Sequence, residues 1–116
     1  MVLRLKDCYG TWQQYLQHFP KSHRFTIGSK VDVIFLESIE LSFLASYSSG
    51  EEKLSLVGKT ISKVDLLKLL LQLAWEVTAL DNKKYVHLSE QLDEIGKMLG
   101  GWKRQLINKN SHPSIE

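Results

Sequence analysis

The side chains best suited to bind another molecule are basic, and the first cluster of them precedes a long apolar segment. Lys21, His23, Arg24 and Lys30 occur close together, and the first acidic residue after them is Asp32. Phosphate groups and acidic protein surfaces are the natural partners of such a cluster. These cations also crowd the predicted beginning of a helix, where the helix dipole disfavours positive charge. The cluster predicts an anion-binding site, although a flexible junction with hydrated charges would explain it equally well.

A second basic cluster lies near the C-terminus. It contains Lys97, Lys103, Arg104 and Lys109. The acidic residues of the same segment all precede it, and none occurs between Ile95 and Ile115. Because cations stabilise the last turns of a helix, the helix dipole alone could account for this arrangement. Further lysines follow the preceding apolar segment and are interpreted as a solvated face: Lys53, Lys59, Lys63 and Lys68.

Residues that could catalyse a reaction or bind a metal are scattered. The four histidines never pair with a carboxylate or another histidine in a complete ligand set. The single cysteine, Cys8, excludes an internal disulfide and a cysteine zinc site. Some four-helix ribonucleases use an arginine followed by a histidine four to six residues later, but Arg24 and Arg104 lack that partner. We therefore expect no catalytic residues, no metal and no cofactor, and a protein that is not an enzyme.

Length and composition predict a single globular domain. The chain has 116 residues, a net charge of +2, 43% hydrophobic residues and 24% charged residues. The N-terminus lacks the apolar core of a signal peptide. The most apolar region, Val64 to Leu80, is interrupted by charged side chains and does not read as a membrane span. A cytoplasmic protein is expected.

Apolar spacing predicts four helices and no strands. Asp7 is the expected N-cap of the first helix, and Ser48 or Ser49 is expected to form a capping box at the third. Asp81 and Asn82 are expected to supply the turn and cap before the fourth helix. The predicted helices span residues 7–19, 20–47, 49–80 and 84–107. Short connections between them predict an all-α, up-down-up-down four-helix bundle within residues 1–108, followed by a disordered tail at residues 109–116.

The fourth helix carries one regular apolar stripe that is interrupted by two glycines. The stripe consists of Leu88, Leu92, Ile95, Leu99, Trp102 and Leu106. Gly100 and Gly101 weaken a helix by about 1 kcal/mol each relative to alanine, so their presence needs a reason. We expect another backbone to pass close to them, either within the same bundle or from a neighbouring subunit.

The second and third helices each carry two apolar faces, one more than a small bundle needs. On the second helix the additional face contains Leu36, Ile39 and Phe43. A tightly wrapped monomer could hide these residues, but apolar surface left after a core is built usually marks an interface. We therefore predict self-association through Leu36, Ile39 and Phe43, and place Gly100, Gly101 and Trp102 in the same oligomer interface.

The sequence resembles the accessory variability determinant (Avd) family of diversity-generating retroelements. The resemblance lies in Phe19-Pro20-Lys21 followed by Arg24, in the leucine-rich third helix, and above all in the stretch from Glu94 to Trp102, EIGKMLGGW. It covers roughly Thr11 to Leu106. This family is itself similar to the four-helix proteins encoded in 23S rRNA intervening sequences.

The resemblance implies a bundle that assembles into a ring- or barrel-like homo-oligomer, a pentamer in this family. It implies a non-enzymatic partner of a reverse transcriptase that binds RNA and DNA with little sequence preference and assists mutagenic cDNA synthesis. The family's basic positions correspond here to Lys21, Arg24, Lys97, Lys103 and Arg104. With Lys30 from the first cluster, these are the predicted nucleic-acid-binding residues. The alternative is a scaffold bundle of the rRNA intervening-sequence type, with no nucleic-acid role of its own.

Overall fold

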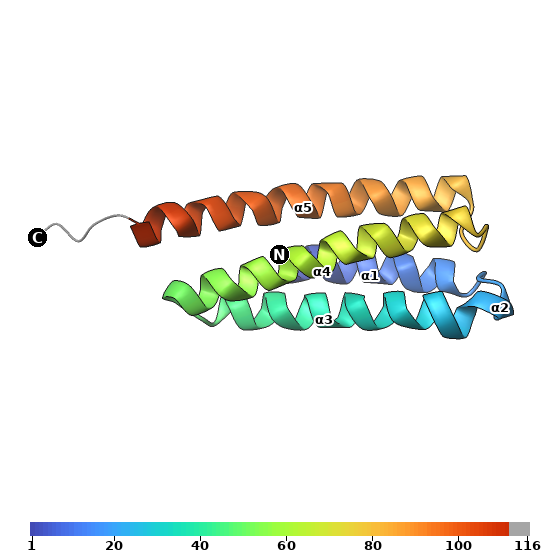
Figure 1. Ribbon diagram of the computed structural model, residues 1–116, viewed down its shortest axis with the longest axis horizontal. Coiled ribbons are helices and arrows are strands. Elements are labelled where there is room, and N and C mark those ends of the chain that lie inside the picture. The colour runs from blue at the N-terminus through green and yellow to red at the C-terminus, as the bar shows by residue number, and fades with distance from the viewer. Residues whose placement is uncertain (112–116) are drawn as a thin grey trace, which may run out of the picture.

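The computed structural model describes residues 1–111, and every regular element among them is helical (Figure 1). The elements are α1 (Val2–Leu16), α2 (Lys21–His23), the π-helix η1 (Arg24–Gly28), α3 (Ser29–Ser46), α4 (Gly50–Glu76) and α5 (Asn82–Ser111). Because α2, η1 and α3 follow one another without a break, residues 1–111 form four helical rods. Among the described residues no strand occurs, as predicted.

The four rods form an elongated antiparallel bundle of 61 × 20 × 19 Å. α1 packs against α3 and α5, and α4 packs against the same two helices, so α1 and α4 lie diagonally opposite each other. Each connection joins neighbouring helices at one end of the bundle (Figure 1). This arrangement confirms the predicted four-helix bundle with up-down-up-down order.

The predicted helix boundaries were less accurate at the start of the first helix. α1 begins at Val2, so the prediction that Asp7 is its N-cap was wrong, and Asp7 lies exposed within the helix. Leu5 is fully buried together with Cys8 and Trp12, which extends the helical apolar spacing toward the N-terminus. The packing of Leu5 therefore continues the helix beyond the polar residue that resembled a cap.

The start and end of α4 also differ from the prediction. Ser49 occupies the N-cap position, but its side chain makes no capping hydrogen bond, so the capping box is not formed. α4 ends at Glu76 rather than Leu80, because Thr78 adopts a positive φ of 62°. The Ala79 and Thr78 amides then donate to the carbonyls of Ala74 and Trp75, at 2.9 and 3.0 Å, in a Schellman motif.

α5 is longer than predicted at both ends. It runs from Asn82 to Ser111, so residues 109–111 of the predicted tail are helical, and residues 112–116 lie outside the described part. Asp81 caps its first turn as expected, because the Asp81 carboxylate accepts a hydrogen bond from the Lys84 amide at 2.9 Å. That hydrogen bond is the largest cause of the lowered pKa of Asp81.

The core contains a cluster of aromatic rings where α1 meets α3. The Trp12 ring packs edge-on against Phe19 and stacks on Phe35, with centroid distances of 5.4 and 6.2 Å. Gln13 and Trp12 both donate to the Asp32 carboxylate on α3, at 2.6 and 3.4 Å. The apolar stripe of α5 completes this core, with Leu88, Leu92, Ile95 and Leu99 buried. α1 is thus held to α3 by both packing and hydrogen bonds.

α1 covers only part of the bundle. Its N-terminus lies close to the middle of the long axis, whereas α3, α4 and α5 continue beyond it (Figure 1). In that half of the bundle α3 and α4 bury small side chains, namely Ser42, Ala45, Val57 and Thr60. The large aromatic and leucine side chains of the core belong to the half that α1 covers.

Candidate nucleic-acid interface

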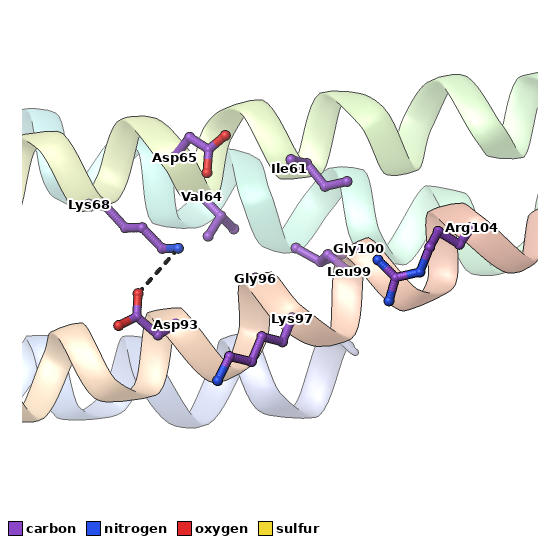
Figure 2. A pocket seen from close by; sticks show the side chains of 10 residues that line it. All are labelled: Ile61, Val64, Asp65, Lys68, Asp93, Gly96, Lys97, Leu99, Gly100 and Arg104. Atoms are coloured by element: carbon purple, nitrogen blue, oxygen red, sulfur yellow. Dashed lines mark ion pairs between the residues drawn. The ribbon is translucent and has the colours of Figure 1, made fainter.

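A groove between α4 and α5 brings together basic side chains from both helices (Figure 2). Its volume is about 400 Å³. Ile61, Val64 and Leu99 form an apolar floor, and Figure 2 shows Lys68 reaching from α4 toward Asp93 on α5. The other lining residues are Asp65 on α4 and Gly96, Lys97, Gly100 and Arg104 on α5. We call this site the α4–α5 groove.

Gly96 allows the Lys68 side chain to cross the groove. A Cβ atom at position 96 would lie 3.1 Å from the Lys68 Nζ, a tighter contact than side chains normally make. With glycine there, the Lys68 ammonium pairs with Asp93 at 3.3 Å. Both side chains are partly exposed, so the pair contributes at most about 1 kcal/mol to stability. It neutralises one of the two carboxylates in the groove.

Arg104 lies over the glycine pair. Cβ atoms added at Gly100 and Gly101 would lie 3.7 and 3.8 Å from the Arg104 guanidinium nitrogens, which are their nearest neighbours. No backbone of another helix within residues 1–111 comes within 4 Å of either position. The expectation that the same bundle supplies a close backbone was therefore wrong. The alternative, that a neighbouring subunit approaches there, stays a prediction.

The groove keeps cations available for an anion. Among residues 1–111, no carboxylate lies within ion-pair distance of Lys97 or Arg104. Lys97 and Arg104 are exposed, and their spacing of seven residues places them on one face of α5. A guanidinium binds phosphate oxygens with two parallel N–H donors, whereas a lysine acts as a mobile point charge. The arrangement suits a phosphate group above an apolar floor.

The structure separates the six predicted nucleic-acid-binding residues. Lys97 and Arg104 line the α4–α5 groove, and Lys103 is exposed on α5 outside it. Lys21, Arg24 and Lys30 lie in α2, η1 and α3, at the end of the bundle opposite the C-terminus of α5 (Figure 1). The two basic clusters therefore form two separate surfaces rather than one.

Arg24 has a structural role that the sequence did not suggest. Its guanidinium donates to the carbonyl oxygens of Gln17 and Phe19, at 3.0 and 3.4 Å. These carbonyls follow the last turn of α1, where backbone oxygens lack helical partners and a cation is favourable. Arg24 is also half-buried, whereas Lys21 and Lys30 are exposed. Lys21 and Lys30 are thus the cations of this cluster that face solvent.

The predicted oligomer-interface residues on α3 border apolar hollows. Leu36 and Phe43 are 48% and 49% exposed, and Ile39 is half-buried. With Val2 of α1 they line a groove of about 630 Å³. Trp102 is half-buried and shares a second hollow with Phe43 and Tyr47. One copy of the chain therefore leaves apolar surface uncovered on α3, as the second apolar face predicted.

Groups with other reactive chemistry are few in the described part of the chain. Burial raises the pKa of the Cys8 thiol to about 12, which keeps it protonated and unreactive. Residues 1–111 contain no group of three His, Cys, Asp or Glu side chains that could hold a metal ion. Nor is any helix in this range both long and apolar enough to cross a membrane.

Sequence analysis missed Lys68 as a groove residue. It was interpreted as part of a solvated face, because its partner Asp93 lies on another helix. The spacing of Lys68 along α4 does not reveal which α5 residue it meets, since that depends on how the two helices pack.

The fold and its surfaces define a four-helix bundle over residues 1–111, with a basic groove on one side and uncovered apolar residues on another. The sequence model of the bAvd-like family matches residues 2–106, and the chain belongs to this family. The resemblance to Avd proteins is thereby confirmed, and membership points to an accessory protein of a diversity-generating retroelement. No curated protein and no solved structure matches the chain.

Proposed function

We propose that this chain is a nucleic-acid-binding accessory protein of a diversity-generating retroelement, and that it partners the reverse transcriptase in mutagenic cDNA synthesis. The observation that carries the proposal is the α4–α5 groove, where Lys97 and Arg104 lie over an apolar floor and neither forms an ion pair with a carboxylate of residues 1–111. Family membership supplies the biological setting. The protein acts in the cytoplasm without catalysis, by binding RNA and DNA with little sequence preference.

Phosphate contacts explain the expected lack of sequence preference. They position a nucleic acid and carry most of the affinity, but they do not distinguish bases. The net charge of one chain is only +2, and assembly into a homo-oligomer such as a ring-like pentamer would strengthen nucleic-acid binding by adding the positive charges of the copies. The uncovered apolar face of α3 supports such assembly.

The groove is tested by charge reversal. Lys97→Glu with Arg104→Glu is expected to weaken binding of a fluorescein-labelled single-stranded oligonucleotide at least about tenfold and to flatten its dependence on salt. Fluorescence anisotropy at several salt concentrations measures both. Lys59→Glu with Lys83→Glu is the matched control, because it changes the net charge equally at two exposed lysines that lie outside the groove and are not predicted to bind nucleic acid. Equal losses in the two double variants would count against a specific role of the groove.

A scaffold bundle without a nucleic-acid role is the second candidate, and the apolar groove between α1 and α3 favours it. Wild-type protein that fails to bind RNA or DNA at low salt would support this candidate over the first. Co-purification with a reverse transcriptase encoded nearby, beside repeats that differ at adenines, would support the retroelement role. Sedimentation of wild type and Phe43→Lys tests whether the α3 face holds copies together.

A further inference from the structure

Phe25 is an exposed aromatic side chain in the basic surface formed by α2 and η1. It is 80% exposed, the highest value among the large apolar side chains of residues 1–111. It does not belong to the core, whereas its neighbour Ile27 packs against the core. Because the Phe25 side chain buries little surface, replacing it would cost the fold little stability. Packing within one copy therefore does not explain why a phenylalanine occupies this position.

The backbone that carries Phe25 is held in place on both sides. Before it, Arg24 bonds to the carbonyl oxygens of Gln17 and Phe19. After it, Thr26 donates to the His23 carbonyl at 3.3 Å, and Ser29 donates to the Arg24 carbonyl at 3.4 Å. The ring is therefore presented to solvent from a backbone that is already ordered, which lowers the entropy cost of a contact.

Gly28 allows η1 to pack closely against the end of α1. A Cβ atom at position 28 would lie 3.0 Å from the Leu16 Cδ1 atom, so the backbone of η1 packs directly on the last turn of α1. The π-helix accommodates this close approach by adding a residue to the turn. With Gly28 and Ile27 directed inward, Phe25 is left on the outer side.

The charged side chains nearest to Phe25 along the chain are positive. No Asp or Glu occurs from Cys8 to Val31, and the next carboxylate, Asp32, is engaged by Trp12 and Gln13. Lys21 lies about one helical turn before Phe25, and Lys30 lies about one π-turn after it, since π-helical bonds join residues five apart. Both lysines are exposed. The ring is flanked along the rod by two cations.

From this geometry we infer that Phe25 stacks on a base of a single-stranded nucleic acid, whose phosphates Lys21 and Lys30 hold. A protein that binds single strands without sequence preference combines cations that follow the backbone with aromatic rings on which bases stack. In a duplex the base faces are covered by their neighbours, so this surface selects single-stranded segments. The inference rests on the proposed nucleic-acid role and deepens it by naming the strand class and the contact.

The test compares variants of Phe25 in the full-length protein. Phe25→Ala is expected to weaken binding of labelled oligo(dT) and oligo(rA) about tenfold, with the salt dependence unchanged because no phosphate contact is lost. Phe25→Leu keeps the apolar bulk without the ring and is expected to lose as much. Phe25→Trp is expected to retain binding and to add fluorescence quenching beyond that of the native tryptophans. Binding of a duplex of equal length is expected to be the same in all variants.

Three outcomes would overturn the inference. The first is wild-type affinity in Phe25→Ala while Lys97→Glu with Arg104→Glu abolishes binding. This result would rule out the stacking contact but would be consistent with the proposed function. Full binding by Phe25→Leu would show that the contact is apolar rather than aromatic. Phe25-dependent sedimentation with anionic phospholipid vesicles, without Phe25-dependent oligonucleotide binding, would assign the surface to a membrane instead. Wild type that binds no oligonucleotide at low salt would refute the proposed function itself.

Discussion

Replacing Gly100 and Gly101 with alanine tests what surrounds this pair. In a single copy, the new methyl groups would lie 3.7 and 3.8 Å from the Arg104 guanidinium, which is ordinary van der Waals contact with a flexible side chain. Each replacement removes conformational freedom from the unfolded chain and is expected to stabilise the helix by about 0.5–1 kcal/mol. The double variant is therefore expected to gain about 1–2 kcal/mol.

This gain is large enough to measure as a shift in Tm. For 116 residues the entropy of unfolding is about 0.24 kcal/mol/K, so the double variant is expected to melt about 4–8 °C higher. Far-UV circular dichroism at several protein concentrations measures Tm, and sedimentation velocity measures the assembly state. Gly96→Ala is the matched control: its methyl group would displace the Lys68 Nζ at 3.1 Å, loosen the pair with Asp93 and offset the gain.

The outcomes separate the two explanations for the glycines. A lower Tm of the double variant at every concentration would refute the reasoning, because it would require a close backbone within the same chain. A higher Tm in dilute protein, combined with loss of an oligomer, would support a neighbouring subunit at Gly100 and Gly101. A higher Tm with unchanged assembly would remove these residues from the interface.

Further predictions concern stability and reactivity. Arg24→Ala is expected to lower the free energy of unfolding by about 1–2 kcal/mol, because it removes charged donors from the α1 carbonyls. Thr78→Gly is expected to raise it by about 1 kcal/mol, because a β-branched residue is strained at a φ of 62°. Cys8 is expected to resist alkylation until the protein unfolds, since burial raises its pKa from 9.0 to about 12. Between pH 9.0 and about 12 the folded chain keeps the thiol proton, whereas the unfolded chain loses it. The free energy of unfolding is therefore expected to fall as pH rises through this range.

Controls exist for each of these predictions. Lys21→Ala, beside Arg24 but exposed, is expected to change stability by no more than about 0.5 kcal/mol in urea titrations. If Arg24→Ala were equally neutral, its bonds to the carbonyls would not matter. Thr78→Ala keeps a side chain at the strained backbone position, so it is expected to raise the free energy of unfolding by less than Thr78→Gly does. Alkylation of Cys8 at the same rate in native and denatured protein would contradict its burial.

Apolar spacing predicted the number and order of helices, because each helix must bury one regular face. It failed at helix ends, where a few local interactions decide. The end of α4 depends on Thr78 in a left-handed conformation, which threonine rarely adopts and no pattern indicates. The start of α1 depends on whether Leu5 is buried, and that is decided by α1 packing on its neighbours.

The candidate site was predictable only within a single helix. Lys97 and Arg104 share a face of α5 because of their spacing, and the sequence shows this directly. Lys68 joins them only because α4 and α5 pack with a particular register, which the sequence does not display. Arg24 was predicted to bind an anion, yet it donates to carbonyls of a turn whose geometry follows from the fold. The sequence therefore did not predict the roles of Lys68 and Arg24, because these roles depend on contacts with other elements of the fold.

The short first helix has a consequence for how the bundle opens. α1 covers one half of the long axis, and the other half contains three helices held mainly by small residues such as Ala45 and Val57 (Figure 1). Amide protons near Trp12 and Leu92 are therefore expected to exchange with solvent only when the whole chain unfolds. Those at the beginning of α4 and the end of α5 exchange earlier, through local fraying that leaves the other half intact. Deuterium uptake along a single copy is graded from one end to the other.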